Sequence, residues 1–127
     1  MTPIPEETKQ RALILLRAAS KGNFEVRARV SDLSESDREM LVALNDLIDV
    51  VDAYVRESQA SMSFASQGKF FRRMMDRGLP GTFGLGARVI NRATVTMEEQ
   101  SLLLQKAREE RLELANEFEM AISQLSG

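Results

Sequence analysis

The sequence contains no cysteine and no histidine among its 127 residues. Without cysteine, disulfide scaffolds and thiolate metal sites are excluded. Without histidine, the chain lacks the side chain most often used as general acid, general base or zinc ligand. Most familiar active sites are therefore ruled out, and we expect no enzyme activity, no catalytic residue, no cofactor and no metal.

Long apolar runs are also absent, since no stretch approaches the roughly 18 residues of a membrane-spanning helix. The segment 1–7 lacks the charged region followed by an apolar one that marks a secretory signal. We therefore expect a cytoplasmic protein that does not associate with membranes. The net charge of −2 gives no general attraction to nucleic acid, so we expect no nucleic-acid partner either.

Aromatic residues are scarce at 6%, with no tryptophan, whereas charged residues make up 28% of the chain. This balance is closer to long exposed helices than to a thick globular core. The length leaves room for one domain or two very small ones. A partner chain could complete the core.

What the sequence does contain is a repeat with a fixed offset of 46 residues. A period in this range indicates two copies of one supersecondary unit joined end to end. In each copy the matching residues lie between a helical stretch and a segment that cannot be helical, so the unit is helix, connector, helix. The seven identities are Ala19/Ala65, Ser20/Ser66, Gly22/Gly68, Phe24/Phe70, Arg27/Arg73, Leu33/Leu79 and Asn45/Asn91.

The first copy begins with a helix that follows Pro5 and ends near Lys21, because Gly22 interrupts the apolar periodicity. Over 23–30, apolar and charged residues alternate as they do in a strand. A single strand would have no partner strand in this chain. We therefore expect an extended connector whose apolar side chains pack on the helices.

A second helix is predicted over 37–67, with Ser34 or Ser36 as its cap. Its apolar residues follow a heptad pattern that continues to the end of the helix. A second connector follows, in which glycine and proline break the helical pattern. The residues expected to end the helices or shape the connectors are Gly22, Phe24, Gly68, Phe70, Gly78, Pro80 and Gly81.

The third predicted helix begins at Thr82 or Phe83 and runs to about 125, a length of roughly 65 Å at 1.5 Å per residue. It carries one apolar seam, and nothing else in the chain is long enough to cover that seam. The simplest neighbour is the same helix in a second chain, so we expect a parallel homodimer. The dimer seam is predicted to include Leu44, Ile48, Val51, Leu104, Leu114 and Phe118.

This order of elements, with a bulky apolar residue followed by asparagine in the second helix of each unit, is similar to the HAMP domain of bacterial sensor proteins. The resemblance covers nearly the whole chain. It implies two parallel four-helix bundles formed in a homodimer, with helix 37–67 shared by both units. The matching positions are Gly22, Phe24, Val26, Val30, Met40, Leu44, Asn45 and Leu47 in the first copy, and Gly68, Phe70, Leu79, Ile90 and Asn91 in the second.

Within 49–94 the chain resembles the region just ahead of the methyl-accepting segment in cytoplasmic chemotaxis receptors. The segments that carry this likeness are 52–58, 69–73, 78–81 and 89–94, and 114–119 looks like the start of the signalling coil.

The resemblance implies an all-α fold of three helices and two extended connectors, ending in a long coiled-coil helix. The implied parts are a first unit over 1–52, a second over 53–98 and a signalling helix over 99–127. Their implied role is to transmit a change of helix packing to downstream signalling helices, as an adaptor segment of a chemoreceptor.

Two polar features have simpler interpretations than a ligand site. Asn45 and Asn91 are expected to cap helices or to bond between helices, where a repeated buried polar residue could fix helix register. Four glycines within 78–86 suggest a phosphate cradle. They lack the Lys-Ser/Thr ending of a P-loop and follow no predicted strand, so nucleotide binding is not expected there.

A basic cluster in the second connector leaves an alternative open. The simple interpretation is a solvated face neutralised by acids, with Phe70 and either Met74 or Met75 turned into the bundle. The alternative is a freestanding small helical regulator that binds a partner helix or an anionic ligand, a cyclic dinucleotide or a lipid, through 69–77. The residues of this possible anion site are Lys69, Arg72, Arg73 and Arg77.

Overall fold

The computed structural model describes residues 3–126, and those residues form three α-helices and no strand. Helix α1 spans Glu6–Ser20, α2 spans Glu35–Ser66 and α3 spans Gly81–Ser126. The predicted all-α fold of three helices with two connectors is confirmed. The alternating segment 23–30 is extended and unpaired, as expected, although its pattern resembles a strand.

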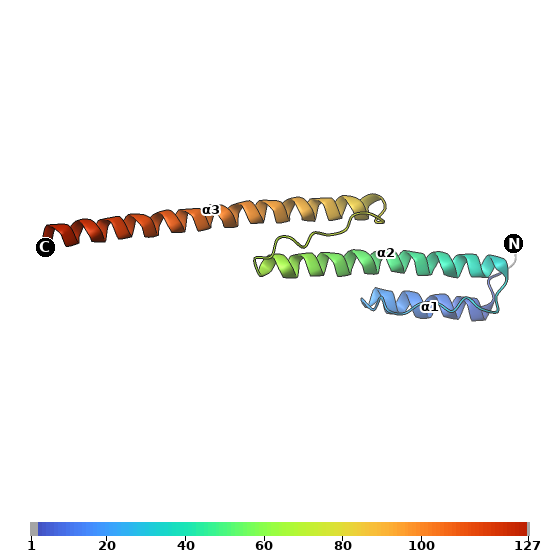
Figure 1. The fold of residues 1–127 in the computed structure, drawn as a ribbon. Helices are drawn as coiled ribbons and strands as arrows, with labels where there is room; N and C mark the ends of the chain where they lie inside the picture. Colours follow the sequence, from blue (N-terminus) through green and yellow to red (C-terminus); the bar gives the residue numbers. More distant parts are fainter. Residues whose placement is uncertain (1–2, 127) are drawn as a thin grey trace.

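All three helices point in the same direction, and each connector runs back along the helix that precedes it (Figure 1). Helix α1 lies beside the first half of α2, and the first half of α3 lies beside the second half of α2. The rest of α3 projects beyond the end of α2. The molecule is therefore a staggered rod in which α2 belongs to two successive packing units.

The helix starts follow from local chemistry. The Ser34 hydroxyl accepts a hydrogen bond from the backbone N–H of Asp37 at 3.2 Å, which satisfies one of the free donors at the start of α2. Acidic residues in the first turns of α1 and α2 face the positive end of each helix dipole. Helix α3 starts directly at Gly81, one residue after Pro80.

The apolar core lies in the first unit, between α1, the first connector and the first half of α2. Leu15 and Leu41 are fully buried there, and a buried leucine side chain contributes about 1.5–3 kcal/mol. The other buried members of this core are Ala12, Ala28 and Ile48.

The interface between α2 and α3 is lined by smaller and more polar side chains. Met74 of the second connector is buried there. The other buried residues of this second interface are Ser61, Ala65, Gly84, Ala87 and Thr94.

The last part of α3 packs on no other described part of the chain, since every residue from 99 to 126 is exposed. Its exposed apolar side chains include the predicted seam residues Leu104, Leu114 and Phe118. Across residues 3–126, no helix combines the length and apolarity needed to cross a membrane.

Candidate functional site

The two units hold their connectors in the same way, through one asparagine each. Asn45 of α2 accepts the backbone N–H of Ala28 at 2.8 Å and donates its amide to the Ala28 carbonyl at 2.9 Å. Asn91 of α3 binds both backbone groups of Met74 in the same manner, at 2.8 and 3.0 Å. Each carboxamide supplies the two hydrogen bonds that a neighbouring strand would give. We call these contacts the asparagine clamps.

The clamps differ from the role expected of these residues. Among the described residues, the hydrogen bonds of the Asn45 and Asn91 carboxamides go to the connector backbone, and none of them caps a helix or reaches a neighbouring helix. Sequence spacing alone could not distinguish these partners, since the connector approaches the helix only in the folded chain.

Both helices that precede a connector end in the same turn. Gly22 donates its N–H to Ala19 at 2.9 Å and has φ 83°, and Gly68 donates to Ala65 at 3.0 Å and has φ 77°. Both glycines thus occupy the left-handed region, in which a branched side chain is strained. The helix-ending conformation expected for them is present in both units.

The far ends of the connectors also match, although the residues there differ. Asp32 has φ 62°, and its repeat equivalent Gly78 has φ 88°. Aspartate is one of the few residues other than glycine that enters this region readily. The repeat therefore extends to positions that share a backbone conformation without sharing an amino acid.

A second pair of equivalent contacts joins each helix to the first turn of the next one. The buried hydroxyl of Thr8 donates to an Asp37 carboxylate oxygen at 3.1 Å, which ties α1 to α2. At the equivalent positions, Tyr54 of α2 meets Phe83 of α3 edge to face, with ring centroids 5.7 Å apart. Sequence reasoning missed both pairs, and the 46-residue offset was the signal that could have related them.

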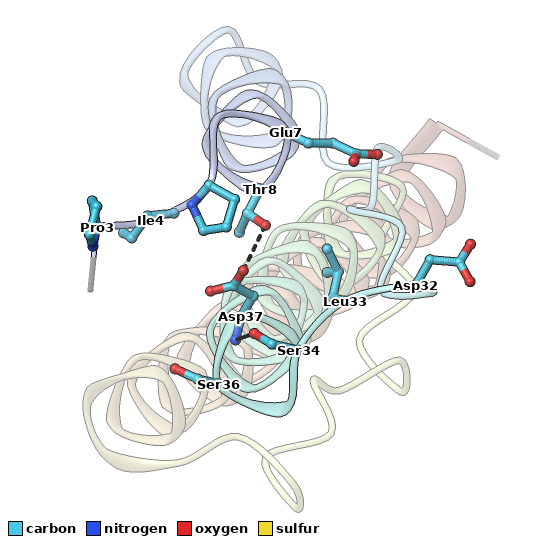
Figure 2. Close-up of a pocket in the computed structure, with 10 residues that line it drawn as sticks. Pro3, Ile4, Glu7, Thr8, Asp32, Leu33, Ser34, Ser36 and Asp37 are labelled. Carbon is cyan, nitrogen blue, oxygen red and sulfur yellow. Dashed lines mark hydrogen bonds between the residues drawn. The ribbon is translucent and has the colours of Figure 1, made fainter. Parts of the chain in front are cut away.

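Figure 2 shows the Thr8 contact at the edge of a cavity of about 560 Å³ between the starts of α1 and α2. Its lining includes three carboxylates, those of Glu7, Asp32 and Asp37. The Glu7 and Asp32 carboxylates lie apart from that of Asp37. No group of three or more potential ligands is placed to hold a metal ion in the part of the chain that the structure describes.

The cations of the second connector do not converge. Arg72 makes a two-pronged ion pair with Glu57, with both N···O distances 3.0 Å, and Arg73 lies 3.7 Å from Glu98. The Lys69 ammonium lies 5.7 Å above the ring of Phe64, whereas Arg77 is simply exposed. Because these four cations have different surroundings, their arrangement does not favour one shared anion site.

The apolar side chains of this connector divide between inward and outward positions, as expected for the simple interpretation. Phe70 is half-buried and Met74 is buried, while Phe71 and Met75 are exposed.

The hydrogen bond from Arg72 lowers the pKa of Glu57, and the same contact raises the pKa of Arg72.

One arginine in each connector contacts the following helix. Arg27 donates from Nε to Asp49 at 2.7 Å and from Nη1 to two connector carbonyls. Its equivalent Arg73 has Val95 at the position of that aspartate, and its buried Nη1 finds no hydrogen-bond partner among the described residues.

The predicted seam residues fall into two groups. Ile48 is buried in the chain's own core, and Leu44 and Val51 are half-buried. Leu104, Leu114 and Phe118 are all exposed on the projecting part of α3. Their meeting with a second chain stays a prediction.

These features describe a rod of two repeated helical units with a free helical tail. No family model and no solved structure matches the chain. The chain is 33% identical over 87 residues to the methyl-accepting chemotaxis protein Amb0994 of Paramagnetospirillum magneticum (strain ATCC 700264 / AMB-1). The matched residues are 67% of this chain and 19% of that protein, so they span about a fifth of the relative's length.

This similarity supports a segment related to chemoreceptors, in agreement with the resemblance found in the sequence. It does not test the tandem HAMP units or the homodimer, which stay predictions.

Proposed function

We propose that this chain is a signal-transmitting segment of a bacterial chemoreceptor, located in the cytoplasm and without catalytic activity of its own. The observation that carries the proposal is the continuity of α2, a 32-residue helix that belongs to both units. A displacement of its first half must move its second half, because an uninterrupted helix is stiff over this length. The similarity to a chemotaxis protein supports the same role.

The contacts suggest a route for the signal. A shift of α1 would act on α2 through the Thr8–Asp37 hydrogen bond and the shared core. Helix α2 would act on α3 through the contact of Tyr54 with Phe83. The asparagine clamps would keep each connector attached while the helices rotate or slide between two packings.

A second copy of the chain is part of the proposal. Each unit has two helices in one chain, and no described residue covers the apolar seam on the tail of α3. A parallel homodimer would complete two four-helix units over 1–52 and 53–98 and a two-stranded coil over 99–127. Downstream signalling helices would then receive the output of that coil.

The absence of native cysteine makes a clean test of this dimer possible. In a parallel coil, Leu114→Cys places two thiols face to face, so rapid oxidation to a disulfide-linked pair of chains is expected. The neighbouring Glu113→Cys lies off the seam and serves as the matched control. Sedimentation equilibrium should give the mass of two chains. A chain that sediments as a monomer, with equally slow oxidation of both variants, would refute the proposed dimer.

Transmission along the rod needs a separate measurement. Thr8→Val keeps the shape of the side chain but removes its hydrogen bond to Asp37. In a Leu114→Cys background we expect this change to alter the disulfide rate in the distant coil several-fold. Ser20→Ala, at an exposed position of α1, should leave the rate unchanged. An unaltered rate in the Thr8 variant would contradict the relay while leaving the dimer intact.

A further inference from the structure

The outer face of the second connector is apolar where that of the first is charged. Phe71 and Met75 are 74% and 64% exposed, and their repeat equivalents are the exposed Glu25 and Arg29. The connector geometry is the same in both units, so the fold does not require apolar side chains at these positions. An exposed phenylalanine and an exposed methionine on the same connector are a candidate contact surface.

Two further side chains extend this surface. The ring of Phe64 lies 6.0 Å from that of Phe71, edge to face, and Lys69 sits over the Phe64 ring. We call Phe64, Lys69, Phe71 and Met75 the connector patch. The segment 69–77 has four basic residues and one acid, a net charge of +3. Because Arg72 and Arg73 pair with Glu57 and Glu98, the positive charge of this surface comes mainly from Lys69 and Arg77.

The projecting half of α3 carries a surface of opposite charge. Leu102, Leu112 and Met120 are 59%, 62% and 64% exposed and lie outside the predicted seam. At 100° per residue, Leu102 and Met120 lie about 160° around the helix from Leu104 and from Phe118, whereas Leu112 lies on the flank, about 80° from Leu104. A two-stranded coil through that seam would leave them uncovered. We call Leu102, Glu109, Leu112 and Met120 the tail back face.

Acidic residues dominate the same stretch of helix. Between 98 and 119 there are seven glutamates and three basic residues, which gives a net charge of −4. The glutamates are at 98, 99, 109, 110, 113, 117 and 119, and the basic residues are Lys106, Arg108 and Arg111.

We propose that the connector patch of one dimer binds the tail back face of a neighbouring dimer of the same chain. The two surfaces have opposite charge and exposed apolar side chains, and the proposal requires that the parallel dimer leave both of them uncovered. This inference rests on that dimer and adds a lateral contact between rods. A basic apolar surface and an acidic apolar surface on one chain are complementary to each other, so a second copy can supply the occupant.

The positions of the two surfaces along the rod set the arrangement. The contact between Arg73 and Glu98 places the connector level with the start of the projecting helix. Leu112 lies 14 residues further on, about 21 Å along the axis. Two antiparallel rods can therefore pair each patch with the other rod's tail. Such a contact is two-fold symmetric. Each dimer has a second patch and a second tail on its other side, so a four-chain species is the first step of lateral association.

Few side chains take part, so the contact is smaller than a standard stable interface and is expected to be weak. Its charges are exposed, so it should weaken further as salt is added. Weak lateral contacts gain strength when many rods are held side by side.

The repeat itself provides the variant for the test. Phe71→Glu with Met75→Arg gives the second connector the residues that the first already carries, at positions that bury little. In sedimentation velocity over a concentration series, the wild-type chain should pass from two-chain to four-chain species. The double variant should raise the dissociation constant of this step at least about tenfold, without a change in helix content.

Introduced cysteines test which surfaces meet. A chain with Met75→Cys and Leu112→Cys should oxidise to a four-chain species at high concentration. The matched control is Arg29→Cys with Leu112→Cys, which uses the equivalent position of the first connector and should stay at two chains.

Three results would overturn the lateral contact. The wild-type chain could remain a dimer at every concentration, or the double variant could associate as the wild type does. The wild type could instead bind phosphatidylglycerol vesicles through Phe71 and Met75 without forming four-chain species, which would assign the patch to lipid. A monomeric wild-type chain would refute the dimer of the proposed function, so the measured mass separates the two failures.

Discussion

The two units share a backbone plan but differ in what they bury. Leu15 and Ile48 of the first unit correspond to Ser61 and Thr94 of the second, and all four are buried. The Ser61 hydroxyl donates to the Arg72 carbonyl at 3.2 Å, so the polar groups are satisfied rather than stranded. Clamp geometry is thus retained while apolar burial is reduced. The second unit should be the easier one to repack.

The charged side chain that binds each connector to the preceding helix has opposite signs in the two units. In the first unit Arg11 donates to the carbonyls of Arg29 and Ser31, at 2.9 and 3.0 Å. Its equivalent Glu57 accepts from the Arg72 guanidinium and from the Met75 backbone N–H. A guanidinium stays charged at all ordinary pH values, whereas a carboxylate can be neutralised by acid. The two fastenings therefore differ in chemistry at one position of the repeat.

The largest effect is expected from giving the first unit the core of the second. Leu15→Ser removes a fully buried leucine and should lower the free energy of unfolding by about 2–5 kcal/mol. Leu16→Ser, at the exposed neighbouring position, is the control and should cost much less. Urea denaturation followed by circular dichroism measures both. Equal losses in the two variants would contradict the assigned core.

The asparagine clamps should each hold only their own connector. Asn45→Ala leaves two backbone groups of Ala28 without partners, and we expect a loss of about 1–3 kcal/mol. Amide exchange should accelerate at Ala28 while Met74 stays protected, and Asn91→Ala should give the reverse pattern. If one substitution exposed both amides, the clamps would not be independent. Asn116→Ala in the exposed tail serves as control.

A smaller effect is expected where the connectors share a left-handed residue. Gly78→Asp copies Asp32 and should change stability by less than about 1 kcal/mol, because aspartate tolerates positive φ. Gly78→Val should cost more than the aspartate variant does, since a branched side chain is strained there. Thermal midpoints of the two variants decide the matter. Equal midpoints would mean that this turn does not depend on φ.

The smallest effect on stability is expected from lowering the pH. The pKa of Glu57 in the folded chain lies below its ordinary value of 4.5, chiefly because Arg72 hydrogen-bonds to the carboxylate. The stabilisation is therefore fully present above that ordinary value and is lost as pH falls through the lowered pKa. Because the pair is partly solvated, we expect less than about 1 kcal/mol. Amide exchange at Met75 between pH 3 and 6 measures this stabilisation. The Glu57→Gln variant should remove most of the pH dependence of that exchange.

Helices and repeat were accessible from sequence because they rest on local signals. Apolar periodicity located three helices, and Gly22 and Gly68 marked where two of them end. Identical residues 46 positions apart revealed the duplication. They occur only where both units require the same side chain. The equivalence of Asp32 with Gly78 depends on a backbone angle, which no residue comparison reports.

The tertiary contacts were less accessible, for a physical reason. Asn45 was recognisable as a repeated polar residue, yet its partner is a connector that approaches it only after folding. Ile48 fits an interchain heptad and also lies in the chain's own core, because periodicity identifies an apolar face and not the neighbour that covers it. The Thr8–Asp37 contact shares no residue type with its equivalent, Tyr54–Phe83, so only the 46-residue offset relates the two pairs.

The common direction of the three helices determines how the chain can grow. In a hairpin of antiparallel helices the chain returns to its starting level, but here the start of α1 and the end of α3 lie at opposite ends of the molecule (Figure 1). A further duplication of the 46-residue unit would therefore lengthen the rod without widening it. The number of copies in such an array would set the distance between its first helix and its last helix.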